Sequence, residues 1–329
     1  MSPLHRSFGG IDMQTRPQRE ALRKRLPRPH LDGVAAIVLA GLSIPLIGGW
    51  FVQAAANPAP SRDVGYIERI VGDLQNIRID RHGQSVQPAI LLPVRVDDRV
   101  FLKRGSELYL QLGNRRVVIT EKDSPYRVPM VDAPPAFLTR LRSTLMSLGG
   151  KLTSQYVRSS APVSTSSRGH EGPLSMSVVE DEVSRLGSHR TVVHIAWDGG
   201  TPPFAVEVVS GQGKKLAGQE GVQDWRVKLP FQRGAIPEGP ARIVVTDGAG
   251  DRLGKLIQII PVQSLPQRVE GDDLPPALHT VVAADQLIQT NRRQWRFEAY
   301  QDVAALADVY EPARLLRDCL ETVPSCYQQ

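Results

Sequence analysis

The stretch that runs from His194 to Val208, HIAWDGGTPPFAVEV, combines residue types that catalysis often uses. A histidine and an aspartate beside a glycine turn can act as a general base and its orienting acid. Here, however, Ile195 and Trp197 alternate in one phase of an extended strand, so His194 points to the opposite face. The pattern predicts a strand–turn–strand corner of a β-domain, with His194 and Asp198 as candidate contacts to a partner.

The other residues with metal-binding or nucleophilic chemistry form no recognisable motif. The seven histidines include no H-E-x-x-H spacing, and the serines include no G-x-S-x-G nucleophile elbow. Asp247 and Asp251 flank glycines in DGAGD, but they offer too few oxygens for calcium and predict a hairpin turn instead. We therefore predict no catalytic residue, no metal, no cofactor and no enzymatic activity. A hydrolase that uses His194, Asp198 and a serine stays open as an alternative.

Trp225 and Tyr109 are aromatic residues whose exposure would indicate a binding surface. Trp225 alternates in phase with Val227 and Leu229, which predicts a core anchor in a β-sandwich. An exposed Trp225 or Tyr109 would instead suit a glycan or a protein partner, since such rings offer a large apolar surface with a polar edge. Both residues are therefore candidate partner contacts.

The two cysteines of the chain, Cys319 and Cys326, lie seven residues apart in CLETVPSC. They can close a small disulfide loop in an oxidising compartment, or they can stay as free thiols. A zinc site is not expected, because no histidine nearby completes a set of ligands.

The N-terminus predicts a membrane anchor. Residues 1–33 carry seven Lys/Arg against three Asp/Glu, which accounts for +4 of the net charge of +6. Residues 34–52 are all apolar or small, and a helix of this length spans roughly 28 Å, close to the thickness of a bilayer core. By the positive-inside rule the basic tail stays in the cytoplasm and the rest of the chain is exported.

Two other interpretations of residues 34–52 remain. A cleaved signal peptide would use the Ala54-Ala55-Ala56 site, although the basic region before it is unusually long. A buried soluble helix rarely lacks charge over so long a run. An anchor and a signal peptide both place the rest of the chain outside the cytoplasm, in the periplasm of a bacterium. The remaining part of the chain, residues 34–329, carries a net charge of only +2 (+6 minus +4), which does not suit binding to nucleic acid.

Residues 66–150 predict a small β-domain followed by a helix. Two short apolar runs joined by a Gly113-Asn114 step are a good hairpin signal. The segments VGDLQNIRI and LPVRVDDRVFLKRGSELYLQLGNRRVVI resemble the FecR-like domain. The positions that carry the resemblance are Gly72, Leu74, Arg78, Val94, Asp98, Ser106, Leu108, Leu110 and Leu112. The resemblance implies a periplasmic β-module with no catalytic signature.

The helix that closes this region is predicted from leucines at helical spacing, starting after Pro134-Pro135 and ending at Gly149-Gly150. Residues 151–173, rich in Ser and Gly, are interpreted as a linker. Residues 174–262 resemble an immunoglobulin-like sandwich, and residues 272–325 predict a helical hairpin. The strands predicted in the sandwich are LSMSVVEDEV, RTVVHIAW, FAVEVV, VQDWRVKL, ARIVVTD and RLGKLIQIIPV.

The whole sequence thus predicts a mainly β, multidomain protein with an N-terminal transmembrane helix, a small FecR-like β-domain, an immunoglobulin-like β-sandwich and a C-terminal helical hairpin. We expect a single-pass protein of the bacterial inner membrane that faces the periplasm and acts as a non-enzymatic binding, scaffold or signalling accessory protein. Its partner would be an envelope or periplasmic protein, and the basic tail would hold any cytoplasmic partner. A cell-wall or glycan-binding structural protein is the main alternative.

Overall fold

The computed structural model describes residues 62–132, 135–160, 172–180, 184–231, 236–267, 274–322 and 327. All of these residues belong to one compact unit that spans 57–329. The predicted basic tail (1–33) and membrane span (34–52) lie outside the described residues, so the anchor stays a prediction. Among the helices that the structure describes, none is both long and apolar enough to cross a bilayer.

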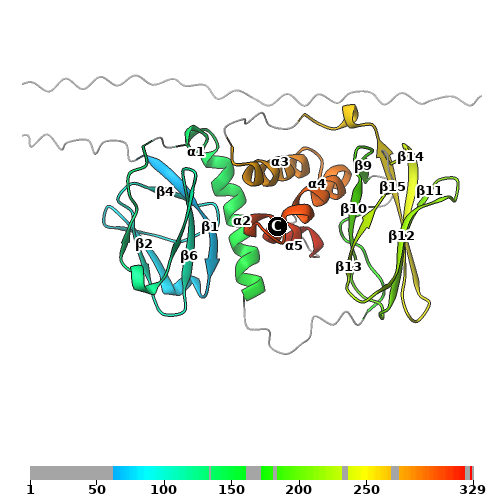
Figure 1. The fold of residues 1–329 in the computed structure, drawn as a ribbon, viewed down its shortest axis with the longest axis horizontal. Coiled ribbons are helices and arrows are strands. Elements are labelled where there is room, and N and C mark those ends of the chain that lie inside the picture. The colour runs from blue at the N-terminus through cyan, green and yellow to red at the C-terminus, as the bar shows by residue number, and fades with distance from the viewer. Residues whose placement is uncertain are drawn as a thin grey trace, which may run out of the picture. The chain divides into compact units, whose positions relative to one another are not determined.

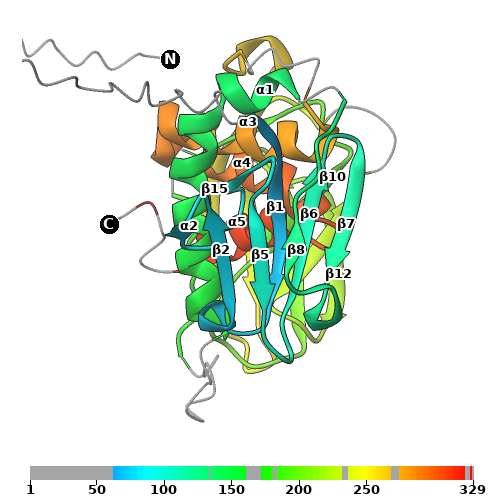
Figure 2. The same ribbon diagram turned by 90° about the vertical axis from the view of Figure 1, so that its left-hand side faces the viewer.

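The first β-module, residues 62–132, contains two four-stranded antiparallel sheets (Figures 1 and 2). The first sheet has the order β4 (Pro93–Arg95), β1 (Asp63–Val71), β6 (Glu107–Leu112) and β7 (Arg115–Ile119). The second has the order β3 (Gln84–Val86), β2 (Ile77–Arg81), β5 (Arg99–Leu102) and β8 (Tyr126–Arg127). The predicted hairpin at Gly113-Asn114 is confirmed, since Leu112 pairs with Arg115 across it.

A buried carboxylate holds one turn of the first β-module. Asp98 is only 1% exposed, and it accepts hydrogen bonds from the Arg81 guanidinium at 2.8 Å and from the backbone N–H of Arg95 at 2.9 Å. Because a buried carboxylate needs such partners, Asp98 has a structural role here.

Two helices follow this module, α1 (Ala136–Arg140) and α2 (Arg142–Ser160). Helix α2 continues through Gly149-Gly150, where the sequence analysis ended it, and takes up the first residues of the predicted linker. The reason is a close approach: a Cβ at Gly149 would collide with the carbonyl oxygen of Ile90. Gly149 is therefore a contact point of the helix and not its end. Thr153 strengthens the contact by accepting a hydrogen bond from the Ile90 N–H at 2.9 Å.

The second β-module, residues 172–267, contains a five-stranded and a two-stranded sheet. The larger sheet has the order β12 (Lys215–Val222), β11 (Phe204–Ser210), β14 (Gly239–Thr246), β15 (Arg252–Ile260) and β9 (Arg185–Gly187), with β9 parallel to β15. The smaller sheet pairs β10 (Val192–Ala196) with β13 (Arg226–Pro230). The strand predicted at 174–183 is absent from its described part, where Ser175 forms only an isolated bridge with Asp198.

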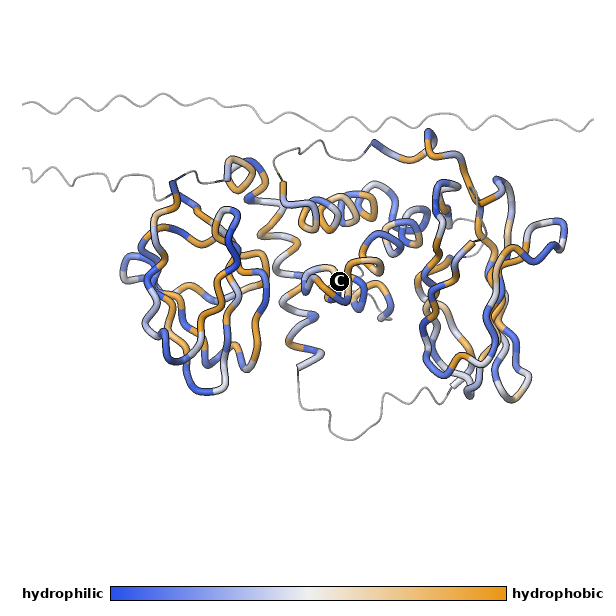
Figure 3. The backbone as a smooth tube through the Cα atoms, in the orientation of Figure 1, coloured by the Kyte–Doolittle hydropathy of each residue, from blue (hydrophilic) through white to orange (hydrophobic). Residues whose placement is uncertain are grey.

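Alternating hydropathy builds both modules, as the alternation of orange and blue along the strands shows (Figure 3). In the second module, Trp197 and Phe204 meet edge to face with ring centroids 5.1 Å apart, and Phe204 meets Trp225 in the same way at 5.7 Å. Such pairs add to the gain from burial. The predicted corner from His194 to Val208 therefore anchors an aromatic core.

The C-terminal region is helical, as predicted, but it contains three helices: α3 (Pro276–Thr290), α4 (Arg292–Leu306) and α5 (Glu311–Glu321). The Asn291 side chain accepts the Gln294 N–H at 3.2 Å and so caps the start of α4. Pro312 lies in the first turn of α5, the position where the missing N–H of proline does no harm.

The C-terminal helices contact both β-modules and α2. Tyr310, which precedes α5, shares a hydrogen bond of 3.3 Å between its hydroxyl and that of Tyr66 on β1. Lys151 on α2 pairs with the buried Asp285 on α3 at 3.1 Å. In the second module, Arg190 pairs with Glu298 on α4 at 2.5 Å. The helical region therefore docks on the rest of the chain through specific polar contacts.

Candidate functional site

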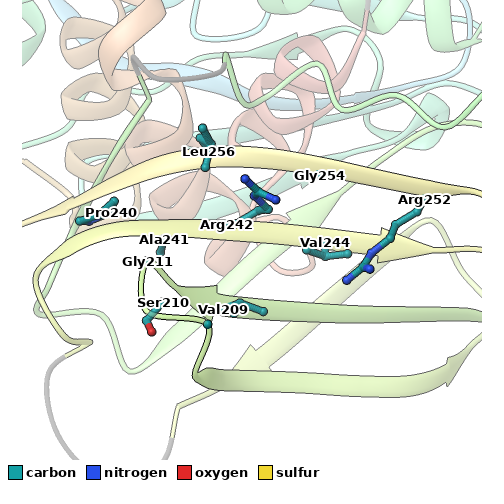
Figure 4. A pocket seen from close by; sticks show the side chains of 11 residues that line it. Val209, Ser210, Gly211, Pro240, Ala241, Arg242, Val244, Arg252, Gly254 and Leu256 are labelled. Atoms are coloured by element: carbon teal, nitrogen blue, oxygen red, sulfur yellow. The ribbon is translucent and has the colours of Figure 1, made fainter.

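A hollow of about 650 Å³ lies on the outer face of the five-stranded sheet (Figure 4). Its lining comes from β11, β14, β15 and the loop that follows β11, so it belongs to one module. We call it the arginine groove. Its lining residues are Val209, Ser210, Gly211, Gly213, Pro240, Ala241, Arg242, Val244, Arg252, Gly254 and Leu256.

The register between β14 and β15 creates the groove. Residues two apart on a strand share a face, and cross-strand partners lie side by side on it. On the outer face, three successive cross-strand pairs, each called a level below, are Arg242 with Leu256, Val244 with Gly254, and Thr246 with Arg252. At the middle level Gly254 contributes no side chain. The floor between the two arginines is therefore one side chain short, and the buried Val244 lies beneath it.

The floor of the groove is apolar, and the two arginines stand at its ends. Val244 is only 4% exposed, although it points away from the core of the module. The stem of Arg242 lies close to Gly254, since a Cβ added there would be 3.4 Å from the Arg242 Cδ. The Arg242 and Arg252 side chains themselves are exposed. Arginine commonly covers apolar surface with its stem while its guanidinium stays in water.

The groove is electropositive because its lining contains two arginines and no acidic residue. Glu207 lies beside it, opposite Val244 on β11, but its carboxylate is paired with Lys215 at 2.7 Å. That hydrogen bond with Glu207 raises the pKa of Lys215, so both charges are engaged. Within the part of the chain that the structure describes, Arg242 and Arg252 form no ion pair with a carboxylate.

His194 lies at the contact between β10 and α4. Its backbone N–H donates to the Gln301 side chain at 2.7 Å, and its carbonyl accepts from the Gln301 amide at 3.0 Å. Burial lowers the pKa of the His194 imidazole, and the nearby positive charges of Lys228 and Arg190 lower it further. The surroundings of His194 thus include a helix of the same chain, and the interpretation of this residue as a partner contact stays a prediction.

Asp198 lies further along the same extended segment. Its backbone pairs with Ser175 in both directions at 2.8 Å, and its carboxylate accepts the Gly199 N–H at 3.0 Å. Four residues of extended chain separate the Cα atoms of Asp198 and His194 by about 13 Å, which is too far for direct hydrogen bonding between their side chains. The pair that the hydrolase alternative needs is therefore not formed in this structure.

Trp225 and Tyr109 are both partly buried. The Trp225 indole N–H donates to the carbonyl of Gly199 at 2.8 Å, which ties it to the corner of the module. The Tyr109 ring lies between the guanidinium groups of Arg69 and Arg116, with centroid distances of 5.2 and 5.1 Å. Cation–π contacts of this kind hold the ring in place. Their role toward a partner stays a prediction.

The acidic loop at Asp247 is a turn, as the sequence indicated. The Asp247 carboxylate accepts backbone N–H groups from Thr201 at 3.0 Å, Ala249 at 3.0 Å and Asp251 at 2.8 Å. The first of these bonds is the main cause of its lowered pKa. Across the described residues, no group of three or more His, Cys, Asp or Glu side chains is placed to hold a metal ion.

Cys319 on α5 is fully buried and is disulfide-bonded. Cys326, the other cysteine of the sequence, lies outside the described residues. The pairing of these two residues stays a prediction.

The arginine groove was not found by sequence analysis. The alternation in GPARIVVT does place Arg242 out of phase with the buried Ala241 and Ile243, but an outward arginine is ordinary on a strand. What makes the groove is the position of Gly254 opposite Val244, which depends on the pairing of two strands.

Comparisons with known proteins give only distant structural similarity. No family model and no curated protein matches the chain. Among solved structures, a biofilm-associated protein (BSP domain) is 17% identical with a TM-score of 0.22, covering 25% of this chain and 15% of that one. The Arg-specific cysteine proteinase gingipain R is 10% identical with a TM-score of 0.22, covering 27% and 19%. CopC from Methylosinus trichosporium is 15% identical with a TM-score of 0.19, covering 25% and 88%. The chain therefore spans less than a fifth of the first two structures.

Proposed function

We propose that this chain is a membrane-anchored, periplasm-facing binding or scaffold protein of a bacterial envelope, and that the arginine groove is its docking site. In this proposal residues 34–52 form the anchor, residues 66–150 a FecR-like module and residues 174–262 an immunoglobulin-like sandwich. The paired, mainly antiparallel sheets and the apolar residues that they bury support the two module assignments.

The observation that carries the proposal is the unneutralised positive charge over an apolar floor. Two arginines without a carboxylate partner among the described residues flank the buried Val244. Protein interfaces are enriched in arginine and keep a desolvated apolar centre inside a polar rim. The groove combines both features on one face of a sheet.

The proposal is tested by crosslinking in living cells. A photo-reactive amino acid placed at the exposed Gln258, which pairs with Pro240 at the rim of the groove, should form an adduct with an exported protein. The matched control places the same amino acid at the exposed Lys103 of the first module. The expected adduct forms only from position 258, is identified by mass spectrometry, and is lost when Arg242 and Arg252 are both changed to Gln.

Two results would count against this function. Absence of any protein adduct from position 258, with the full-length chain present at its normal level, would remove the docking role of the groove. Cosedimentation of the chain with purified peptidoglycan, unaffected by the arginine changes, would favour the glycan-binding alternative.

A further inference from the structure

We infer that the arginine groove binds an extended acidic peptide segment, in which an apolar residue lies midway between two carboxylates four residues apart. This inference rests on the proposed function, because it specifies the partner chemistry of the same groove. It follows from the positions of the two charges and of the apolar floor between them.

The spacing of the two arginines sets the spacing of the carboxylates. Arg252 pairs with Thr246, so Arg242 and Arg252 differ by four residues in level along β14. At a rise of about 3.3 Å per residue, these levels are about 13 Å apart. An extended peptide lying along β14 has the same rise, so its side chains i and i+4 reach both levels on one face.

The middle of the groove selects the residue between the carboxylates. Side chain i+2 of the peptide lies at the level of Val244 and Gly254, where the floor is apolar and one of the two side chains is missing. An apolar side chain placed there removes its own surface from water against the apolar lining, which is favourable.

The charge of the groove selects carboxylates at the two ends. An arginine guanidinium binds a carboxylate through two parallel hydrogen bonds, which are stronger than neutral ones. The lining holds no acidic residue that would compete, and the neighbouring Glu207 is already paired with Lys215. A peptide carboxylate would therefore be the first partner of each guanidinium.

The separation between the levels of the two arginines also favours an extended peptide over a helical one. Four residues of an α-helix advance only about 6 Å, which is about half of the separation between the two levels. A small single anion would reach one arginine only. The extended segment is therefore the ligand that uses both ends and the floor together.

The inference is tested with three labelled peptides and the full-length chain, by fluorescence anisotropy. The first peptide has nine residues, with carboxylates at positions 3 and 7 and a leucine at position 5. The second has the same composition with adjacent carboxylates, and the third has lysines in their place. We expect the first to bind at least tenfold more tightly than the second, and the third not to bind.

Variants of the chain locate the binding in the groove. Arg242→Gln and Arg252→Gln should each weaken binding of the first peptide by about tenfold, because each removes a charge-assisted pair. Arg104→Gln is the matched control, since Arg104 is an exposed arginine of the first module, and it should leave the affinity unchanged. Gly254→Leu should abolish binding by filling the floor, with an unchanged melting temperature.

The results separate this inference from the function on which it rests. Equal binding of all three peptides, or binding that ignores both arginine variants, would overturn the inference. If position 258 still crosslinks to an exported protein in that case, the docking role stands with a different partner chemistry. A crosslink to a second copy of this chain would also replace the acidic peptide as the occupant.

Discussion

The two β-modules differ in how the charges on one outer sheet face are satisfied. In the first module, Glu68 on β1 pairs with Arg116 on β7 at 2.8 Å, beside Tyr310 at the start of α5. In the second module, Arg242 and Arg252 lie on an outer face where no carboxylate of the described residues pairs with them. The first face is covered by a helix of this chain, and the second is open.

The same contrast exists within the second module. Where α4 docks, Arg190 contacts both Glu298 at 2.5 Å and Asp302 at 2.7 Å. A buried charge is tolerated only when it is paired and hydrogen-bonded. At the covered faces, the carboxylates come from the helix or from another strand of the same sheet. On the open face the one neighbouring carboxylate, that of Glu207, is paired with Lys215. The two arginines of the groove have no carboxylate partner among the described residues, so a partner for them would come from outside the chain.

The largest effect is expected at the covered face, from Glu298→Ala. Glu298 is fully buried and also accepts the Gly187 N–H at 2.9 Å. Its removal leaves the Arg190 guanidinium, in a largely buried contact, without one of its two carboxylate partners. The free energy of unfolding should therefore fall by about 3–5 kcal/mol. Urea unfolding followed by circular dichroism measures the loss. A decrease of less than about 1 kcal/mol would show that the docking of α4 does not depend on this charge.

Glycine substitutions compare the covered and open surfaces directly. Gly149→Ala places a methyl group against the Ile90 carbonyl and should cost about 1–3 kcal/mol through overpacking. Gly254→Ala on the open face meets only the Arg242 stem at 3.4 Å, so it should change stability by less than about 0.5 kcal/mol. Gly150→Ala, with open space around it, is the control for helix propensity and should stabilise slightly. Thermal unfolding of the three variants ranks these effects, and equal values would contradict the close approach at Gly149.

The sequence predicts the strands of the second module better than it predicts how those strands pair. Alternation locates β10, β11, β13, β14 and β15, because one face of each is buried. It misses β12, whose segment KLAGQEGV contains Gly218 and Gly221 and little that favours a strand. Pairing with β11 supplies what local propensity lacks.

The candidate site is less accessible to sequence analysis because it depends on long-range contacts. The strand alternation predicts an outward face for His194, whereas its backbone is bound by Gln301, which lies 107 residues later. The glycine pair at Gly149 predicts a helix end because glycine often has that role, whereas the contact of Gly149 with Ile90 requires the folded module. The arginine groove likewise depends on the register of β14 and β15. These features arise from packing between distant segments, which no local pattern encodes.

A smaller effect is expected from the pH dependence of the covered face. Burial raises the pKa of Glu68, although Arg116 opposes the shift. A carboxyl whose pKa is higher in the folded than in the unfolded state contributes stability at low pH and loses it as the pH rises through the folded value. The stability of the native chain relative to Glu68→Gln should therefore fall as the pH rises above the ordinary range of a glutamate pKa, by less than about 1 kcal/mol. Paired urea titrations at several pH values measure the difference, and the opposite slope would mean that Arg116 outweighs burial.

The smallest effect on folding is expected at the open face, from the combined change of Arg242 and Arg252 to Gln. Neither guanidinium has a carboxylate partner among the described residues, so its removal should alter the free energy of unfolding by no more than about 0.5 kcal/mol. Any repulsion between the two charges is screened by salt, so the small difference should shrink further as ionic strength rises. Thermal unfolding at low and high salt checks both points. A loss above about 2 kcal/mol would make the two arginines part of the folding contacts, as Arg190 is, and the contrast between a covered and an open face would no longer hold.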